Sequence, residues 1–231
     1  MSSTNRFPYT IVDLTHTLSP KIPTWDGSCG FNHHVHHDYD PSAQDQFRTH
    51  KISMNEGIGT HIDSPAHCIA GGRTIDALPL ENLCVPCVMI DVSGASHDSY
   101  SVSVKDIKGF EKNHGDVEAG SLVLFRTGWE RFWREPEKYR NNHRFPSISK
   151  EAAEFLLNRG IVGLGLDTLS PDRGDDGFPV HKIVLGNGGY IIENAFNLSA
   201  LPPQGSFAMA LPLKIENGTE APVRLIGLLK P

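Results

Sequence analysis

The stretch Gly59–His67 reads GTHIDSPAH. His61 and Asp63 are two residues apart, so on an extended strand both side chains point from the same face. Gly59 lets the backbone bend or approach a neighbour closely, and Pro65 ends a strand because it has no N–H to donate. His67 follows the bend and can fold back toward whatever His61 and Asp63 hold. The segment therefore predicts a short strand and a turn that gather three polar side chains.

An imidazole and a carboxylate on one strand face suit a divalent cation of the zinc or manganese type. Spacing alone supports a second interpretation equally well, because short histidine clusters are common in surface loops. A second pair of polar residues bears on this choice. His181 and Glu193 are twelve residues apart, with a glycine turn between them. Glu193 lies in the apolar run YIIENA, where a carboxylate is costly unless it is paired.

Both segments resemble one family. GTHIDSPAH is similar to the signature H-x-G-T-H-x-D-x-P-x-H of the cyclase-like metal-dependent hydrolases, the family of bacterial kynurenine formamidase and isatin hydrolase. The family's second motif, a His followed twelve residues later by the Glu of an E-N-(L/A)-x-N-L stretch, resembles the segment from His181 to Glu193. The similarity extends from YTIVDL near the amino terminus to PVR near the carboxyl terminus.

The resemblance implies a fold and an activity. The fold is a single α/β domain over residues 1–231, with a β-barrel-like core flanked by helices, of the swivelling β/β/α type. The activity is hydrolysis of C–N bonds other than peptide bonds, in a small amide or lactam such as an arylformamide or isatin. One or two zinc or manganese ions would be held by His61, Asp63, His181 and Glu193.

In this scheme a bound cation lowers the pKa of a coordinated water to about 7 and polarises the substrate carbonyl. His67 would act as general base and then general acid, a role that suits an unperturbed pKa of about 6.5. Trp25, in the loop after the first strand, could form the wall of a pocket for a flat substrate, or it could cap the edge of the core.

The sequence departs from the signature at its first position, where the family has a metal-ligating His and this chain has Gly57. Three outcomes are open. The site could bind fewer ions, a nearby residue could substitute (Glu56, His50 or a member of the His33–His37 cluster), or the site could have lost catalysis. The last outcome defines the alternative function, a non-catalytic small-molecule or metal-binding protein with a degenerate site.

The cluster FNHHVHHDYD and the cysteines offer weaker alternatives. Adjacent histidines on a strand face opposite ways, so the cluster favours an exposed or pocket-rim loop over a metal site. Cys68 adjoins His67, which leaves a cysteine-dependent hydrolase as a third hypothesis, although neighbours in sequence do not establish a catalytic pair.

Composition sets the broad class. The chain has 231 residues, 39% of them hydrophobic and 21% charged, and a formal charge of −6, as expected for one soluble domain. Lys and Arg are scattered, which argues against a nucleic-acid surface. No run of 18 apolar residues occurs, so we expect no membrane span and a cytoplasmic location. Homo-oligomers, dimers or larger, are expected from the family resemblance.

Alternating helices and strands are predicted elsewhere. The best-marked helix lies between Ser149, an N-cap residue, and Gly160, a C-terminal glycine, and a strand follows at 161–167. A run that is helical in part, from Trp129 to Tyr139, is expected to break at Pro136. Further predictions are a helix at 104–112 after Ser103 and strands at 9–14, 85–92, 121–128 and 190–195.

Overall fold

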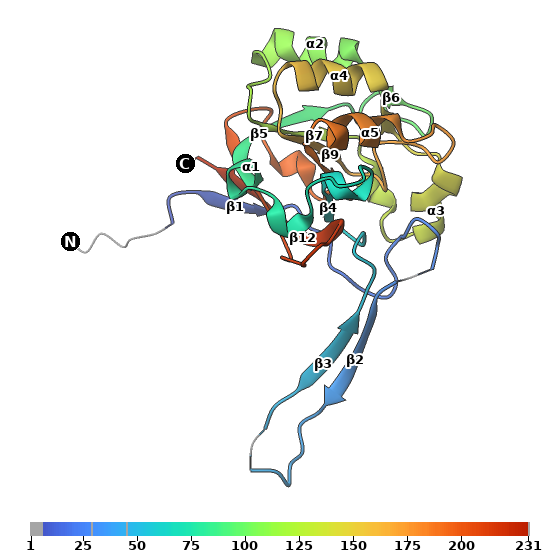
Figure 1. Ribbon diagram of the computed structural model, residues 1–231, viewed down its shortest axis with the longest axis vertical. Helices are drawn as coiled ribbons and strands as arrows, with labels where there is room; N and C mark the ends of the chain where they lie inside the picture. The colour runs from blue at the N-terminus through green and yellow to red at the C-terminus, as the bar shows by residue number, and fades with distance from the viewer. Residues whose placement is uncertain (1–6, 29, 45, 231) are drawn as a thin grey trace, which may run out of the picture.

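The computed structural model describes residues 7–28, 30–44 and 46–230, and its centre is a closed β-barrel (Figure 1). Seven strands follow the order β12-β11-β5-β7-β9-β10-β4, and β4 pairs with β12 to close the ring. An eighth strand, β1, lies outside the ring along β12. The strands are β1 (Thr10–Asp13), β4 (His61–Asp63), β5 (Cys84–Asp91), β7 (Leu122–Arg126), β9 (Gly163–Leu166), β10 (Tyr190–Glu193), β11 (Ser206–Pro212) and β12 (Glu220–Leu229). The predicted fold class is confirmed.

Parallel and antiparallel strands divide the barrel into two parts. Strands β5, β7, β9 and β10 run parallel to one another, whereas β4, β11 and β12 pair antiparallel. A parallel connection needs a crossover, usually a helix. These crossovers contain α2 (Val104–His114), α4 (Lys150–Asn158) and α5 (Pro179–Gly186). Figure 1 shows α2 and α4 side by side over one side of the barrel.

Side chains of the parallel strands alternate between two hydrophobic cores. In β7, Leu122 and Leu124 belong to a cluster with residues from every other strand of the ring except β9, and this cluster fills the barrel. Val123 and Phe125 belong to a second cluster, formed with the covering helices. This period of two is that of a strand buried on both faces. The same alternation decides which side chains of β4 and β10 point out of the barrel.

The sequence predicted the best-marked local structures. The Ser149 side chain accepts a hydrogen bond from Ala152 N at the start of α4, and Gly160 has a φ of +81° after its end. The run from Trp129 to Tyr139 is interrupted as predicted: a 3₁₀ turn ends at Phe132, and Pro136 is the first residue of a separate helix, α3 (Pro136–Arg140). Pro is tolerated at this position because its missing N–H would have no partner in the helix.

A hairpin projects from the barrel. Strands β2 (Asn32–His37) and β3 (Thr49–Ser53) pair with each other alone and extend away from the body (Figure 1). Every residue of β2 is exposed, so the four histidines lie on an open strand where a loop was expected. The remaining short elements of the described residues are α1 (Leu80–Leu83), β6 (Ser101–Val102), β8 (Ser147–Ile148) and several 3₁₀ turns. Across the described ranges, no helix has the length and apolar character needed to cross a membrane.

His16 joins the β1 side of the molecule to the loop after β7. Its ring stacks on Trp133, with centroids 3.7 Å apart and planes 8° from parallel, and is 7% exposed. No residue of the described ranges offers a hydrogen bond to its buried Nε2. Burial lowers the pKa of His16 to about 3, because the charged form would lose its hydration.

We predict that His16 makes the fold less stable in mild acid. Below pH 6.5 the unfolded chain binds a proton at His16, whereas the native state does not bind it until about pH 3. The free energy of unfolding therefore decreases as the pH is lowered through that window. At pH 5 the loss is about 2 kcal/mol. Urea denaturation with a chelator present, at pH 7.5 and pH 5, should show a smaller acid loss for His16→Phe than for the wild type. Equal losses would contradict the prediction.

Candidate metal centre and active site

Strand β4 carries the start of the site on the outer wall of the barrel. Ile62 belongs to the core inside the barrel, so His61 and Asp63, on either side of it, point outward. Antiparallel pairing places Glu193 of β10 opposite His61, and Glu220 of β12 opposite Asp63. Residues from three strands therefore meet on one outer face.

His181 reaches the same place from α5, the helix over this part of the wall. Its Nε2 lies 3.5 Å from Asp63 Oδ2 and 3.4 Å from Glu193 Oε1. His61 Nε2 lies 3.4 Å from Asp63 Oδ1 and 3.3 Å from Glu193 Oε2. Each carboxylate therefore has one oxygen turned to each imidazole. The four residues that the sequence singled out as ligands are brought together.

The other nitrogen of each imidazole is occupied. His181 Nδ1 lies 2.7 Å from Asp172 Oδ2, and His61 Nδ1 lies 2.8 Å from the carbonyl oxygen of Gly59. Both partners are acceptors, so both Nδ1 atoms carry a proton, and in the neutral form of each ring Nε2 would offer its lone pair to an ion. This is the arrangement typical of metal-ligating histidines, whose second nitrogen is held by a carboxylate or a carbonyl.

Asp63 is the most deeply enclosed member. Its residue is 1% exposed, and in the described structure neither carboxylate oxygen has a hydrogen-bond partner. Burial would raise its pKa, but the facing His181 and His61 outweigh burial and hold the pKa below its usual range. The reverse holds for the imidazoles: burial would lower their pKa values, and the carboxylates raise them well above normal. A buried, ionised carboxylate without a hydrogen-bond donor is costly unless a positive charge lies beside it, and a bound cation would supply that charge.

The donor atoms fit such a cation. Two ligands at about 2.1 Å from an ion and at the tetrahedral angle are about 3.4 Å apart. The four nitrogen–oxygen separations of the site are 3.3–3.5 Å, longer than the roughly 2.7–2.9 Å of a direct charged hydrogen bond. Two overlapping groups of potential ligands share Asp63, one with His181 and Glu193 and one with His61 and Glu220. Nitrogen and oxygen donors of this kind suit zinc or manganese.

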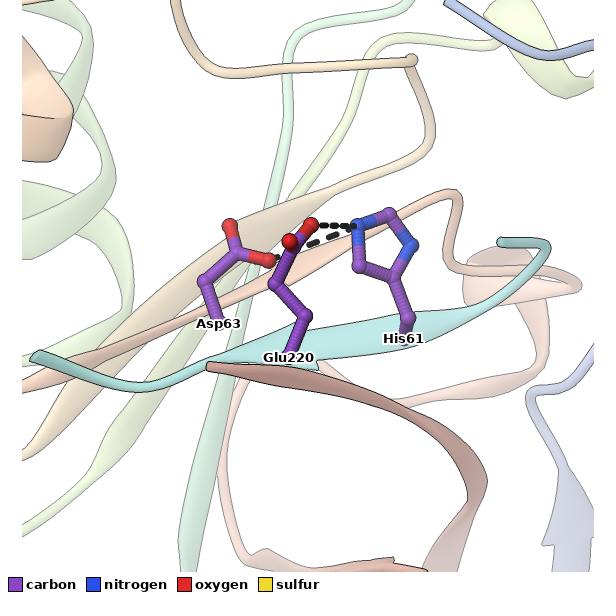
Figure 2. Close-up of side chains that lie close together, drawn as sticks. All are labelled: His61, Asp63 and Glu220. Carbon is purple, nitrogen blue, oxygen red and sulfur yellow. Dashed lines mark ion pairs between the residues drawn. The ribbon is translucent and has the colours of Figure 1, made fainter. Parts of the chain in front are cut away.

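His67 lies beside the metal-binding groups, in the 3₁₀ turn Pro65–His67 that follows β4. Its Nδ1 lies 3.1 Å from Glu220 Oε2, and its side chain is 32% exposed. Glu220 raises the pKa of His67 above its usual value against the opposing effect of burial. Figure 2 shows His61 and Asp63 rising from β4, with the Glu220 side chain between them.

A cavity of about 430 Å³ opens onto these groups. The side chains of His61, Asp63, His67, His181, Glu193 and Glu220 contribute to its lining, together with Trp25 and Phe178. Trp25 stacks on His143 with ring centroids 4.0 Å apart, and its ring centroid lies 5.8 Å from that of Phe178. The pocket thus has a polar side and an aromatic side, as small-molecule sites commonly do.

Polar contacts behind the pocket fix the entry to β4. Asn194 Nδ2 donates to the Gly59 carbonyl, and Thr60 Oγ1 donates to the Asn194 carbonyl. Gly59 has a φ of +64°, and a Cβ there would overlap Leu18. The positive φ is the feature that favours glycine here. This network holds the carbonyl that accepts the His61 proton.

Sequence reasoning missed two members of the site. Asp172 belongs to an aspartate-rich sequence, PDRGDDG, that is typical of an exposed loop, yet it is 1% exposed and accepts hydrogen bonds from Val180 N and His181 N as well as the His181 ring. Glu220 had no local signal, because only the pairing of β12 with β4 brings it to Asp63.

The substitutes suggested for the missing ligand at Gly57 lie elsewhere. Glu56 accepts hydrogen bonds from the backbone of Thr219 and Glu220, outside the ligand groups. His50 lies on β3 of the projecting hairpin, and the His33–His37 cluster lies on β2.

A buried cluster of His, Asp and Glu side chains on the wall of a closed barrel is the type of site that a metal-dependent hydrolase would use. The family model Cyclase, described as "Putative cyclase", matches residues 12–173. An isatin hydrolase of Roseibium aggregatum is 31% identical over 95% of this chain and 91% of its own length. A kynurenine formamidase of Bacillus cytotoxicus is 28% identical over 93% and 95%. The chain belongs to the cyclase family.

Solved structures agree with this assignment. Isatin hydrolase A from Ralstonia solanacearum has a TM-score of 0.88 and 32% identity, covering 96% of this chain and 92% of its own. An isatin hydrolase bound to the product analogue thioisatinate has a TM-score of 0.86 and 28% identity, covering 97% and 94%. A structure described as a potential metal-dependent hydrolase with cyclase activity has a TM-score of 0.74 and 26% identity, covering 95% and 98%.

We predict that Asp172→Asn weakens metal binding about 10- to 100-fold, since loss of a group that orients a ligating histidine has this effect. The amide keeps one acceptor oxygen where the carboxylate has two, and it carries no charge, so it holds the His181 ring less firmly. Isothermal titration of chelator-treated protein with zinc or manganese measures the change. Asp175→Asn, at an exposed position of the same loop, is the matched control. Wild-type affinity in a folded Asp172→Asn protein would refute the prediction.

Proposed function

We propose that this protein is a metal-dependent amidohydrolase that opens a small lactam or cleaves a small linear amide, of the isatin or arylformamide class. The observation that carries the proposal is the set of four 3.3–3.5 Å separations between two imidazoles and two carboxylates at the base of an aromatic-walled pocket. The names of the relatives, isatin hydrolase and kynurenine formamidase, supply the substrate class.

In this proposal His61, Asp63, His181 and Glu193 hold one or two zinc or manganese ions. When bound there, the ion supplies a water that is nucleophilic near neutral pH and polarises the substrate carbonyl. The protein contributes the enclosure. Asp63 and Glu193 are nearly inaccessible to solvent, so their charges act in a medium where they are poorly screened.

His67 is the proton carrier of the proposed reaction. Water adds its oxygen to the carbonyl carbon, the C–N bond breaks, and the nitrogen leaves as an amine with one proton of the water; the carboxylic acid formed releases the other proton to solvent and becomes a carboxylate. His67 accepts the proton from the attacking water and donates it to the leaving nitrogen. Its Nδ1 faces Glu220 at 3.1 Å, which leaves Nε2 for this exchange.

The aromatic side of the pocket supports a flat substrate. Trp25 is held by its stack on His143, and His143 Nε2 lies 2.7 Å from the Trp25 carbonyl oxygen. A side chain fixed in this way can form a wall without losing further freedom when a ligand binds. We assign Trp25 to substrate binding. A cavity of about 430 Å³ is suitable for a one- or two-ring molecule.

The proposal includes the setting of the enzyme. Residues 1–231 act as one domain in a homo-oligomer, a dimer or larger, without nucleic acid or membrane partners. Exposed apolar side chains on the β2–β3 hairpin, Val35 and Ile52, favour contact with another chain. Cys68, Cys84 and Cys87 are free thiols, in keeping with the reducing cytoplasm.

A cysteine nucleophile is disfavoured. Cys68 lines the pocket beside His67, but burial raises the pKa of its thiol, so less thiolate is present at neutral pH. The same pocket could instead serve a non-catalytic binding protein, which is the alternative that activity measurements exclude or establish.

We predict that the wild type, loaded with zinc or manganese, hydrolyses at least one member of a panel of isatin, N-formyl aromatic amines and simple lactams. His67→Asn should lower the rate about 10²- to 10⁴-fold, the usual contribution of a general acid–base group, and keep its metal. His61→Ala should lose both metal and hydrolysis. His97→Asn, an exposed histidine, serves as the control.

Two results would contradict the proposal. A wild-type protein that binds metal and shifts its melting temperature with panel compounds, but turns none over, is a binding protein. Full activity in metal-free His61→Ala would remove the metal from the mechanism.

A further inference from the structure

Gly57 and Glu220 occupy one space. A Cβ added at Gly57 would overlap the Glu220 carboxylate, with Oε1 as its nearest atom. The backbone does not require glycine at this position, because the φ of Gly57 lies outside the left-handed region. Glycine at position 57 therefore reflects the presence of Glu220 in front of it. The only obstacle to a side chain there is another side chain.

Glu220 comes into that space at a defined position. It is the first residue of β12 and lies opposite Asp63 in the pairing of β12 with β4. Glu56, next to Gly57 in sequence, accepts hydrogen bonds from Thr219 N at 2.9 Å and Glu220 N at 3.3 Å. The loop that contains Gly57 is thereby tied to the start of β12. The position of Glu220 is therefore fixed by its backbone hydrogen bond to Glu56 and by the pairing of β12 with β4.

The two oxygens of Glu220 face different partners. Oε1 lies 3.9 Å from His61 Nε2, and Oε2 lies 3.1 Å from His67 Nδ1 (Figure 2 shows the first contact). Potential ligand atoms of Glu220, His61 and Asp63 all lie within 4.8 Å of one another. A role limited to pairing with His67 does not account for Oε1, which faces His61 and lies close to a second carboxylate, Asp63. Like charges so close repel unless a cation lies among them.

We propose that Glu220 is a metal ligand that supplies the donor missing at Gly57, and that the two positions form a compensating pair. The inference rests on the metal centre of the proposed function and names one further residue of it. A carboxylate from β12 takes the place of a side chain from the loop before β4. The same carboxylate positions His67, so that one residue joins the ion to the proton carrier.

The pair can be exchanged experimentally. In chelator-treated protein, Glu220→Gln and Glu220→Gly should each bind zinc or manganese at least about tenfold more weakly, or bind one ion fewer, because a charged ligand is lost. Gly57→His/Glu220→Gly places an imidazole in the vacated space and should recover the lost binding. Gly57→His alone should not bind metal more tightly than the wild type, since Glu220 still fills the space. Such rescue is the non-additive signature of two residues that share one role.

Isothermal titration gives affinity and stoichiometry, and the thermal shift on adding metal gives a second readout independent of hydrolysis. Glu216→Gln, exposed in the loop just before β12, is the matched control. Circular dichroism of each metal-free variant confirms folding, and Glu220→Gln keeps the shape of the side chain if Glu220→Gly unfolds.

The outcomes separate the two proposals. Wild-type affinity and stoichiometry in both Glu220 variants, or a double variant that binds no better than Glu220→Gly, overturns the role of Glu220 while leaving the hydrolase standing. Metal binding that depends on Glu220 in a protein that hydrolyses no panel compound overturns the hydrolase and supports the ligand. A wild type that binds no metal overturns both.

Discussion

The site depends on one buried carboxylate. Asp63 is ionised, almost inaccessible to solvent and without a hydrogen-bond donor among the described residues, a state that is costly for an isolated charge. Its neighbours explain how the fold tolerates it. Two imidazoles present Nε2 atoms to its two oxygens, and each imidazole is fixed from behind by Asp172 or by the Gly59 carbonyl. A divalent cation bound among Asp63, Glu193 and Glu220 would balance the charge of these three carboxylates.

The barrel provides the positions that this arrangement needs. Strand β4 has only three residues, yet it pairs on both sides, so His61 and Asp63 meet Glu193 from one neighbour and Glu220 from the other. Ile62 anchors the strand in the interior core. The parallel half of the ring carries the crossovers, and α5 brings His181 over the outer wall. The potential ligands from β4, β10 and β12 thus lie on neighbouring strands of a closed ring, and hydrogen bonds between these strands keep the ligands together.

Local patterns were sufficient to predict part of this. The two-residue spacing of His61 and Asp63 fixes a shared face wherever the segment is extended, and Ser149 with Gly160 marks both ends of α4. Asp172 could not be recognised, because its aspartate-rich loop reads as solvated until α5 directs two backbone N–H groups at it. Glu220 is placed by long-range strand pairing, and no periodicity within β12 reports that contact. Contacts between distant segments of the chain therefore place Asp172 and Glu220 in the site, and local sequence spacing does not predict such contacts.

The departure of the sequence at Gly57 gains a physical meaning from these contacts. From the sequence alone, a glycine in a motif of ligands leaves three outcomes open: fewer bound ions, a substitute ligand, or a site without catalysis. In the fold, the vacated space holds a carboxylate that faces both His61 and His67, and the remaining donors keep separations suited to an ion. The loss and the gain lie on different segments of the chain, which is why only the structure connects them.

The most direct measurement of the central claim is the metal content per chain, by elemental analysis of wild-type protein purified without added metal or chelator. This account predicts one or two equivalents of zinc or manganese. Persistent absence of metal, with none taken up after dialysis against zinc or manganese, would contradict it, because Asp63 would then be buried and ionised without the cation on which the site depends.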